Sequence, residues 1–285
     1  MIISWSDALY ENNAACKKAF DEHPWSSSIV PIITTDISNK KNLSSCCFVV
    51  YRGYYFLLTA KHCINENAHQ YVNSFTDSSI DISELDLIFD ANDDIDIAFS
   101  YIPRPEDYNL DTDAFINIGY SPQKNNQNRH TRFYLALGYP NKHNKLFNRN
   151  KNAIDRFCTF IHNSNRETEE AIKSHSVNVQ LFNEILHIAC DFTLKEQFYK
   201  PEGGMIQKMF TPEGMSGGAL LYLNDINNCA KGEAAKFSFA GLIIALKQGV
   251  TIGKKKKDVL ISTRLEVVEK ILGDYIDSRY KSRFS

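Results

Sequence analysis

The chain has 285 residues, of which 43% are hydrophobic and 23% are charged, with 32 Lys and Arg against 34 Asp and Glu. This composition is typical of a globular protein, and a formal net charge of -2 excludes the broad basic field that nucleic acids or anionic membranes attract. The longest apolar runs, Tyr54–Leu58 and Gly241–Leu246, are strand-sized, so we expect no membrane span.

The N-terminal segment lacks the pattern of a secretory signal. Asp7 and Glu11 lie where an apolar h-region would be, and no basic n-region precedes them. The seven cysteines show no CxxC or zinc-binding spacing. We therefore expect a cytoplasmic protein with mostly reduced thiols and no bound metal.

The first part of the chain predicts a short helix followed by a β-rich domain. Apolar residues within 3–20 form a weak amphipathic pattern, with Ser6 as a candidate N-cap, so residues 1–27 read as a helical extension. Short β-type runs follow, separated by Asn, Asp, Ser and Gly clusters: Ile29–Thr35, Cys46–Tyr51, Tyr54–Thr59, Tyr71–Phe75, Leu85–Phe89 and Ile95–Ile102. Residues 28–116 are therefore expected to form a β-barrel or sandwich.

A second β-rich half, residues 117–264, begins near Asn117. Its predicted strands are Phe133–Gly138, Phe157–His162, Val177–Leu181, Leu186–Phe192, Met205–Phe210, Gly218–Leu223, Phe237–Leu246 and Val259–Thr263. They do not alternate with helices, which favours antiparallel over parallel sheets. Arg166–Ser174 could form a helical insertion, and Lys254–Lys257 reads as a solvated loop. Residues 265–285 read as a helix, since Leu265–Tyr280 has an apolar stripe at helical spacing.

Three segments carry candidate chemistry: FLLTAKHC at 56–63, DIDIAFSYI at 94–102 and EGMSGGALL at 213–221. The last contains G-x-S-x-G, in which glycines let the backbone turn sharply around a nucleophilic serine. Taken alone, this motif favours a tight turn between strands, because Gly-Ser-Gly turns are common. No histidine follows Ser216, which argues against an α/β-hydrolase, whereas the order His62, Asp96, Ser216 fits a triad assembled between barrels.

These segments resemble the motifs of the trypsin-like, chymotrypsin-fold serine peptidases, in particular the non-secreted members that occur in bacteria. Thr59-Ala60-Lys61-His62-Cys63 resembles the segment around the family's base, Asp96-Ile97-Ala98-Phe99 the segment of its acid, and Gly214-Met215-Ser216-Gly217-Gly218 the segment of its nucleophile. The resemblance extends from about Ser28 to about Tyr280. It implies an all-β fold of two antiparallel six-stranded barrels, followed by a C-terminal helix.

The chemistry of the residues gives each motif a role. His62 would take the proton of the Ser216 hydroxyl, and Asp96 would orient the imidazole. The amides of Gly214 and Ser216 would form the oxyanion hole. Asp96 belongs to an acidic cluster before a strand, and such a cluster is usually a solvated loop. We nevertheless expect Asp96 to be the acid of the triad, because it alone in the cluster begins the apolar run of the strand. The other seven histidines read as surface or structural residues.

The sequence departs from the family pattern at the residue before the nucleophile. Secreted members carry an aspartate there that pairs with a new N-terminus after cleavage, whereas this chain has Met215. We therefore expect activity without such an insertion. Cys47 and Cys63 have the spacing of a disulfide in secreted relatives, although two neighbouring reduced thiols are expected here.

Counting back from the nucleophile gives a candidate specificity pocket. Its base falls at Phe210 and Thr211, its walls at Leu246 and Leu260, and Ile244 belongs to the cleft-lining strand. Such a pocket is apolar and would accept a small or hydrophobic residue. Glu213 could instead favour a basic residue from the rim.

The sequence thus predicts a serine endopeptidase that needs no cofactor and cleaves one or few protein substrates, among them a partner that it activates. Two alternatives stay open. One is a protease-like module that binds peptides or a partner without turnover, or a pseudoprotease whose cleft is ordered only when a partner binds. The other is an esterase or acyltransferase that uses the same triad.

Overall fold

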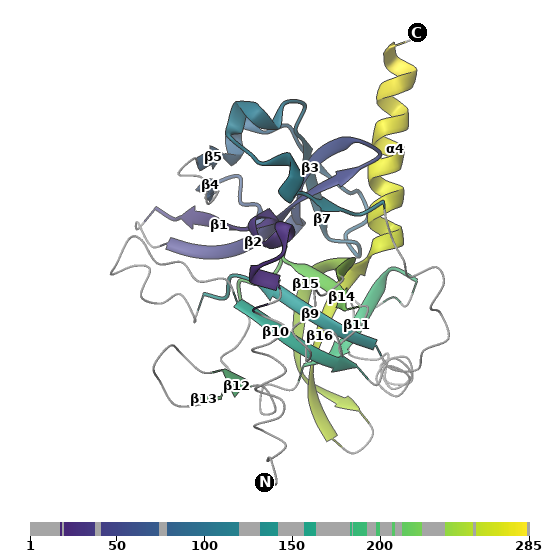
Figure 1. Ribbon diagram of the computed structural model, residues 1–285. Coiled ribbons are helices and arrows are strands. Elements are labelled where there is room, and N and C mark those ends of the chain that lie inside the picture. Colours follow the sequence, from purple (N-terminus) through teal and green to yellow (C-terminus); the bar gives the residue numbers. More distant parts are fainter. Residues whose placement is uncertain are drawn as a thin grey trace.

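The computed structural model places two mainly antiparallel sheets one above the other, with a long C-terminal helix running along the upper sheet and beyond it (Figure 1). The structure describes residues 18, 20–37, 41–73, 79–119, 132–141, 157–163, 183, 185–192, 198–199, 207–208, 213–223, 237–252 and 255–283. Within these residues, no helix is long and apolar enough to cross a lipid bilayer.

The first sheet has eight strands in the order β5-β4-β1-β2-β3-β7-β6, and β8 pairs with β2 in parallel. Its strands are β1 (Ile29–Thr35), β2 (Lys41–Tyr51), β3 (Tyr54–Ala60), β4 (His69–Asn73), β5 (Ser79–Asp81), β6 (Leu87–Phe89), β7 (Ile97–Tyr101) and β8 (Ile116–Asn117). Short 3-10 helices lie between them: η1 (Pro24–Ser28), η2 (Lys61–Cys63), η3 (Ile82–Glu84), η4 (Pro105–Tyr108) and η5 (Thr112–Ala114).

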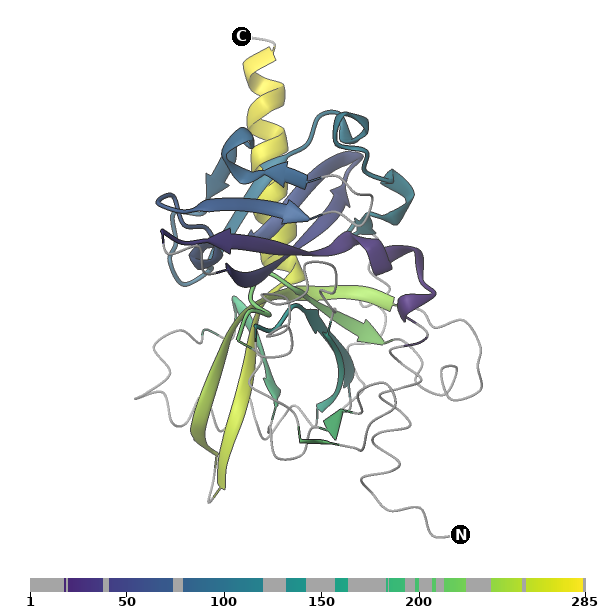
Figure 2. The same ribbon diagram turned by 90° about the vertical axis from the view of Figure 1, so that its left-hand side faces the viewer.

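The second sheet has six strands in the order β10-β9-β14-β15-β16-β11. They are β9 (Arg132–Gly138), β10 (Phe157–Asn163), β11 (His187–Asp191), β14 (Ala219–Leu223), β15 (Phe237–Ile252) and β16 (Lys255–Arg264). A separate ribbon pairs β12 (Phe198–Tyr199) with β13 (Gln207–Lys208). Figure 2 shows that the second sheet curls and that the hairpin of β15 and β16 projects from it.

Alternation along the strands buries both faces of the first sheet. On β2, Cys47 and Val49 join one core while Cys46 and Phe48 join another, because successive side chains point to opposite faces. The first of these cores spans both sheets and also takes the stripe Leu265, Val268, Leu272 and Ile276 of the helix. The two sheets therefore share one apolar core.

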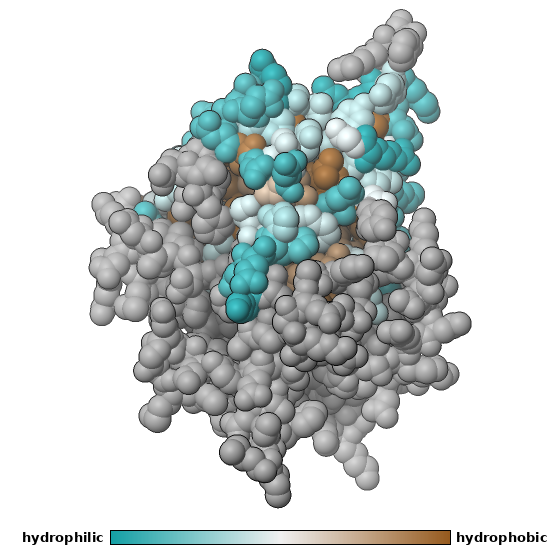
Figure 3. Space-filling model, in the orientation of Figure 1, coloured by the Kyte–Doolittle hydropathy of each residue, from teal (hydrophilic) through white to brown (hydrophobic). Residues whose placement is uncertain are grey.

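The C-terminal helix, α4 (Leu265–Arg283), follows the second sheet, contacts its strands β15 and β16, and also packs against the first sheet. The ring of Tyr275 lies 5.3 Å from that of Phe99 and 6.0 Å from that of Phe56, in edge-on contacts. On one face of the molecule, hydrophilic side chains cover much of the first sheet and α4 (Figure 3). The helix thus ties the end of the second sheet to the first.

The predicted all-β class with a C-terminal helix is confirmed, but two details were wrong. The first sheet has eight strands rather than six, because β5 and β8 are three and two residues long and show no periodic pattern. The expected loop at Lys254–Lys257 is also wrong in part, since Lys255 begins β16. There the backbone pairing of Ile252 with Lys255 extends the hairpin beyond its apolar part.

Other predictions stay open. The helix at 3–20 lies mostly outside the described residues, as do the insertion at Arg166–Ser174 and the strand at Val177–Leu181. The domain boundaries at 28, 117 and 265 remain predictions.

Candidate active site

Strand pairing brings His62 next to Asp96. Ala60 of β3 pairs with Ile97 of β7, so the residues just beyond these strand ends lie side by side, and the Lys61 amide donates to the Asp96 carbonyl at 3.0 Å. The Nδ1 of His62 lies 2.6 Å from Oδ2 of Asp96, while its backbone amide donates to Oδ1 at 3.0 Å. The carboxylate of Asp96 therefore accepts hydrogen bonds from both the ring and the backbone of His62.

This pairing fixes the protonation of the imidazole. The hydrogen bond with Asp96, and next to it the contact with Cys63, raises the pKa of His62 above its ordinary value of 6.5. Because the carboxylate accepts from Nδ1, Nε2 is the nitrogen that is free to exchange a proton in the neutral ring. That nitrogen lies 3.9 Å from the sulfur of Cys63.

The glycines beside Ser216 are required by close backbone approach. A Cβ on Gly217, where φ is +84°, would lie 1.9 Å from the Ser45 carbonyl oxygen, and one on Gly218 would lie 2.0 Å from that of Leu137. The Ser45 amide donates to the Ser216 carbonyl at 2.9 Å, and the Gly217 amide donates to the Ile243 carbonyl at 2.7 Å. The serine turn is thus held between the two sheets.

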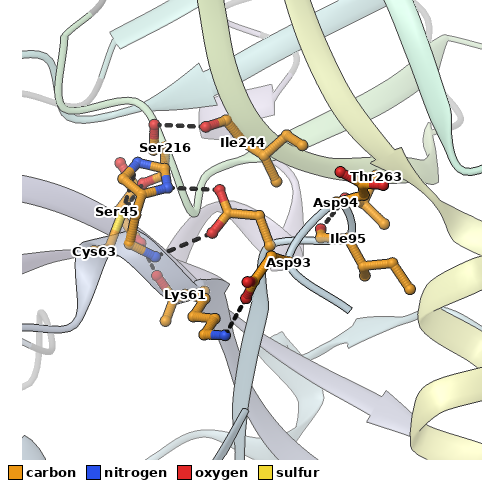
Figure 4. A network of polar contacts seen from close by, with 12 residues as sticks. Ser45, Lys61, Cys63, Asp93, Asp94, Ile95, Ser216, Ile244 and Thr263 are labelled. Carbon is orange, nitrogen blue, oxygen red and sulfur yellow. Dashed lines mark hydrogen bonds and ion pairs between the residues drawn. The ribbon is translucent and has the colours of Figure 1, made fainter. Parts of the chain in front are cut away.

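His62, Asp96 and Ser216 all line one cavity of about 1010 Å³. Figure 4 shows the Ser216 hydroxyl directed to the carbonyl of Ile244, to which it donates at 3.2 Å. The structure therefore brings together the three side chains singled out by the sequence, with the hydroxyl turned toward the backbone rather than toward the ring.

Two backbone amides in the serine turn remain available as hydrogen-bond donors. Within the described part of the chain, neither the Gly214 amide nor the Ser216 amide donates a hydrogen bond to another residue. Both residues line the cavity, and Gly214 has a φ of +101°. The arrangement can present two donors to an oxygen that develops negative charge.

The predicted specificity residues separate into three groups. Glu213, Ile244 and Leu246 line the cavity, whereas Leu260 does not and is buried in the core of the second sheet. Leu260 lies opposite Leu246 in the β15–β16 ladder, and Leu246 packs against the same core, so of this pair only Leu246 also reaches the cavity. Phe210 and Thr211 lie outside the described residues.

Met215 and the two cysteines surround the serine turn. Met215 is 1% exposed and packs in the core of the second sheet. Cys47 and Cys63 are both free, and their thiols donate to the consecutive carbonyls of Gly217 at 3.3 Å and Ser216 at 3.4 Å. The two thiols thus contact the same turn without a disulfide.

Sequence reasoning missed two residues of the second sheet that hold the loop of Asp96. The Nε2 of buried His187 lies 2.7 Å from the Asp94 carbonyl oxygen. The Thr263 hydroxyl donates to the Ile95 carbonyl at 2.7 Å, as Figure 4 shows. Asp96 itself has a φ of +54°, a conformation that costs a non-glycine residue about 1–3 kcal/mol. A polar His187 within a predicted buried strand was the one available signal.

Comparisons with known proteins show which solved structures have a similar fold. No protein-family model matches the sequence, and no curated protein matches it significantly. The solved structure of HL collagenase is similar with a TM-score of 0.52 at 15% identity, over 87% of this chain and 93% of that one. A structure described as GrC is similar with a TM-score of 0.50 at 16% identity, over 89% of this chain and 96% of that one. At these identities the likeness shows a shared fold.

Proposed function

We propose that this chain, which has the two-barrel fold of the trypsin-like serine peptidases, is a serine endopeptidase that forms an acyl-enzyme on Ser216. One observation carries the proposal. A hydrogen-bonded His62–Asp96 pair lines the same cavity as the Ser216 hydroxyl, which lies 120 positions or more away in the chain. Beside them are two backbone amides that have no hydrogen-bond partner among the described residues. Such a constellation is the machinery of acyl transfer.

In the proposed reaction, the Ser216 hydroxyl first turns from the Ile244 carbonyl toward Nε2 of His62, a rotation about one side-chain bond. Nε2 takes the hydroxyl proton as the oxygen attacks the carbonyl carbon of the scissile bond. The imidazolium then gives that proton to the leaving amine, which departs as the acyl-enzyme forms. Water repeats the sequence and releases the acid.

Asp96 supports this proton exchange without taking the proton. It holds Nδ1 protonated and stabilises the positive charge that His62 gains. The amides of Gly214 and Ser216 would stabilise the oxyanion, each by about 3 kcal/mol. No cofactor has a step in this scheme.

The cavity walls suggest which side chain precedes the scissile bond. Ile244 and Leu246 give the wall an apolar character, so we propose a small or hydrophobic residue, for which each methylene contributes about 1–3 kcal/mol. Glu213 lies exposed at the rim of the same cavity, and a basic residue is the competing preference. We further propose limited cleavage of one or few proteins, including a partner that is activated by it.

We also propose a cytoplasmic location. The support is chemical: the described cysteines, Cys46, Cys47, Cys63 and Cys190, are all free, as is usual where thiols are kept reduced.

The test is an unbiased cleavage profile. A library of denatured proteins is incubated with the native chain or with Ser216→Ala, and new peptide termini are identified by mass spectrometry. We expect termini that arise only with the native chain and share a preference before the cleaved bond. Hydrolysis of simple esters without any new termini would contradict peptidase function and indicate an esterase or acyltransferase.

A further inference from the structure

The peptide bond between Glu213 and Gly214 is held from one side. The Asn141 amide donates to the Glu213 carbonyl oxygen at 2.7 Å. The carbonyl and amide of one trans peptide point in opposite directions, so this bond directs the Gly214 amide away from Asn141. The orientation of a proposed oxyanion donor is therefore set by a residue more than 70 positions earlier in the chain.

Asn141 is in turn fixed by the first sheet. Its side-chain Oδ1 accepts from the backbone amide of Leu43, in β2, at 2.5 Å. The same side chain thus connects a strand of the first sheet to the loop that follows β9 in the second.

Ser45, two residues further along β2, holds the peptides on the other side of the turn. Its hydroxyl donates to the Gly214 carbonyl at 2.9 Å and accepts from the Tyr139 amide at 2.9 Å. Its own amide donates to the Ser216 carbonyl at 2.9 Å, and its carbonyl accepts from the Thr59 hydroxyl at 2.7 Å. Ser45 is fully buried, and each of its polar groups has a partner in or beside the turn.

The space around Gly214 leaves the turn little freedom. A Cβ at this position would lie 2.6 Å from the Tyr139 carbonyl oxygen and 2.9 Å from that of Leu43. Met215, the next residue, is buried in apolar surroundings. The turn is therefore confined by neutral hydrogen bonds and packing.

We propose that Asn141 and Ser45 are positioning residues that preform the oxyanion site by anchoring the turn of Glu213–Ser216 to β2. The inference rests on the proposed function, because it assigns these residues to the transition state of that reaction. The first sheet would then position the oxyanion site, and it would also carry the base, His62, and the acid, Asp96. Neither residue touches the reacting atoms.

Matched variants distinguish a role of Asn141 and Ser45 in positioning the oxyanion site from a role in the stability of the fold. Asn141→Leu removes the side-chain acceptor at similar size, and Asn141→Asp keeps it. Ser45→Ala removes the hydroxyl, while Ser28→Ala, the control, removes another buried hydroxyl that donates to the distant Ala114 carbonyl. For each variant, kcat and KM are measured on a cleavable peptide, together with the inhibition constant of a matched peptide aldehyde, whose adduct with serine carries the oxyanion.

We expect Asn141→Leu and Ser45→Ala to lower kcat about 10- to 100-fold, with KM nearly unchanged and the aldehyde weakened by a similar factor. Asn141→Asp and Ser28→Ala should remain close to the native chain in both measurements. Native aldehyde affinity in Asn141→Leu would overturn the inference, whether or not Ser45→Ala folds. A native chain that neither cleaves the peptide nor binds the aldehyde would instead overturn the proposed function, and this inference with it.

Discussion

The buried ring of His187, on β11 of the second sheet, lies with its Nε2 2.7 Å from the carbonyl oxygen of Asp94 in the loop before β7. Its other nitrogen, Nδ1, accepts from the Asn183 amide at 3.0 Å. Burial lowers the pKa of His187, so the folded chain holds this ring neutral with its proton on Nε2. The second sheet thereby holds the loop that carries Asp96 in the first.

His187 should make stability fall in acid. The unfolded chain binds a proton on this histidine below about pH 6.5, whereas the folded chain resists that proton, so the free energy of unfolding decreases as the pH falls through this range. His187→Gln keeps a donor for Asp94 and does not titrate. Urea unfolding between pH 5 and pH 8 should show a shallower pH dependence in the variant. His23, whose pKa burial also lowers, is present in both proteins, and identical slopes would contradict the assignment.

Thr263→Val should disturb the site through the loop of Asp96. The change leaves the Ile95 carbonyl without its donor at nearly unchanged volume, which should destabilise the fold by about 1–3 kcal/mol and lower kcat. Thr263→Ser keeps the hydroxyl and should recover most of both quantities. Denaturant unfolding and steady-state kinetics check this, and equal kcat in the valine and serine variants would argue against it.

The pH dependence of activity should reflect the His62–Asp96 pair. His62 acts as a base only when neutral, and the carboxylate raises its pKa, so kcat/KM should rise with pH through a midpoint above 6.5. Asp96→Asn removes the charge and should lower kcat about 10⁴-fold while moving that midpoint down. A midpoint that is the same in both proteins would show that Asp96 does not set the pKa of His62.

Met215 should make activity independent of an inserted N-terminus. Its apolar environment offers no charge for an ammonium group, so we expect the chain to be active without cleavage near Ile29, as checked by N-terminal sequencing before and after assay. Met215→Leu should retain activity. Met215→Asp buries an unpaired charge and should destabilise the fold by about 3–5 kcal/mol. A requirement for a mature chain beginning near Ile29 would contradict this prediction.

Motif order and apolar runs were enough to single out His62, Asp96 and Ser216 and most strands, because each signal lies within a few consecutive residues. The residues that form the walls of the candidate specificity pocket were harder to predict from the sequence. Leu246 and Leu260 lie opposite each other in the β15–β16 ladder and share a face of the sheet, yet only Leu246 reaches the cavity, because depth within the packed structure differs between the two strands. Counting along the sequence therefore could not show that Leu260 faces the core.

Asn141 and Thr263 escaped prediction for a different reason. Their partners, Leu43 and Ile95, lie 98 and 168 positions away, and a single asparagine or threonine has no local pattern that marks such a contact. Only the packing of one sheet on the other brings these groups together.

A fluorophosphonate that reacts with activated serines shows whether His62 activates Ser216 as a nucleophile, with intact mass and peptide mapping as the readout. We predict one adduct, located on Ser216, that is lost in Ser216→Ala and strongly slowed in His62→Ala. A folded native chain that gains no adduct at neutral to alkaline pH, or gains it equally without His62, would show that His62 does not activate Ser216 as a nucleophile.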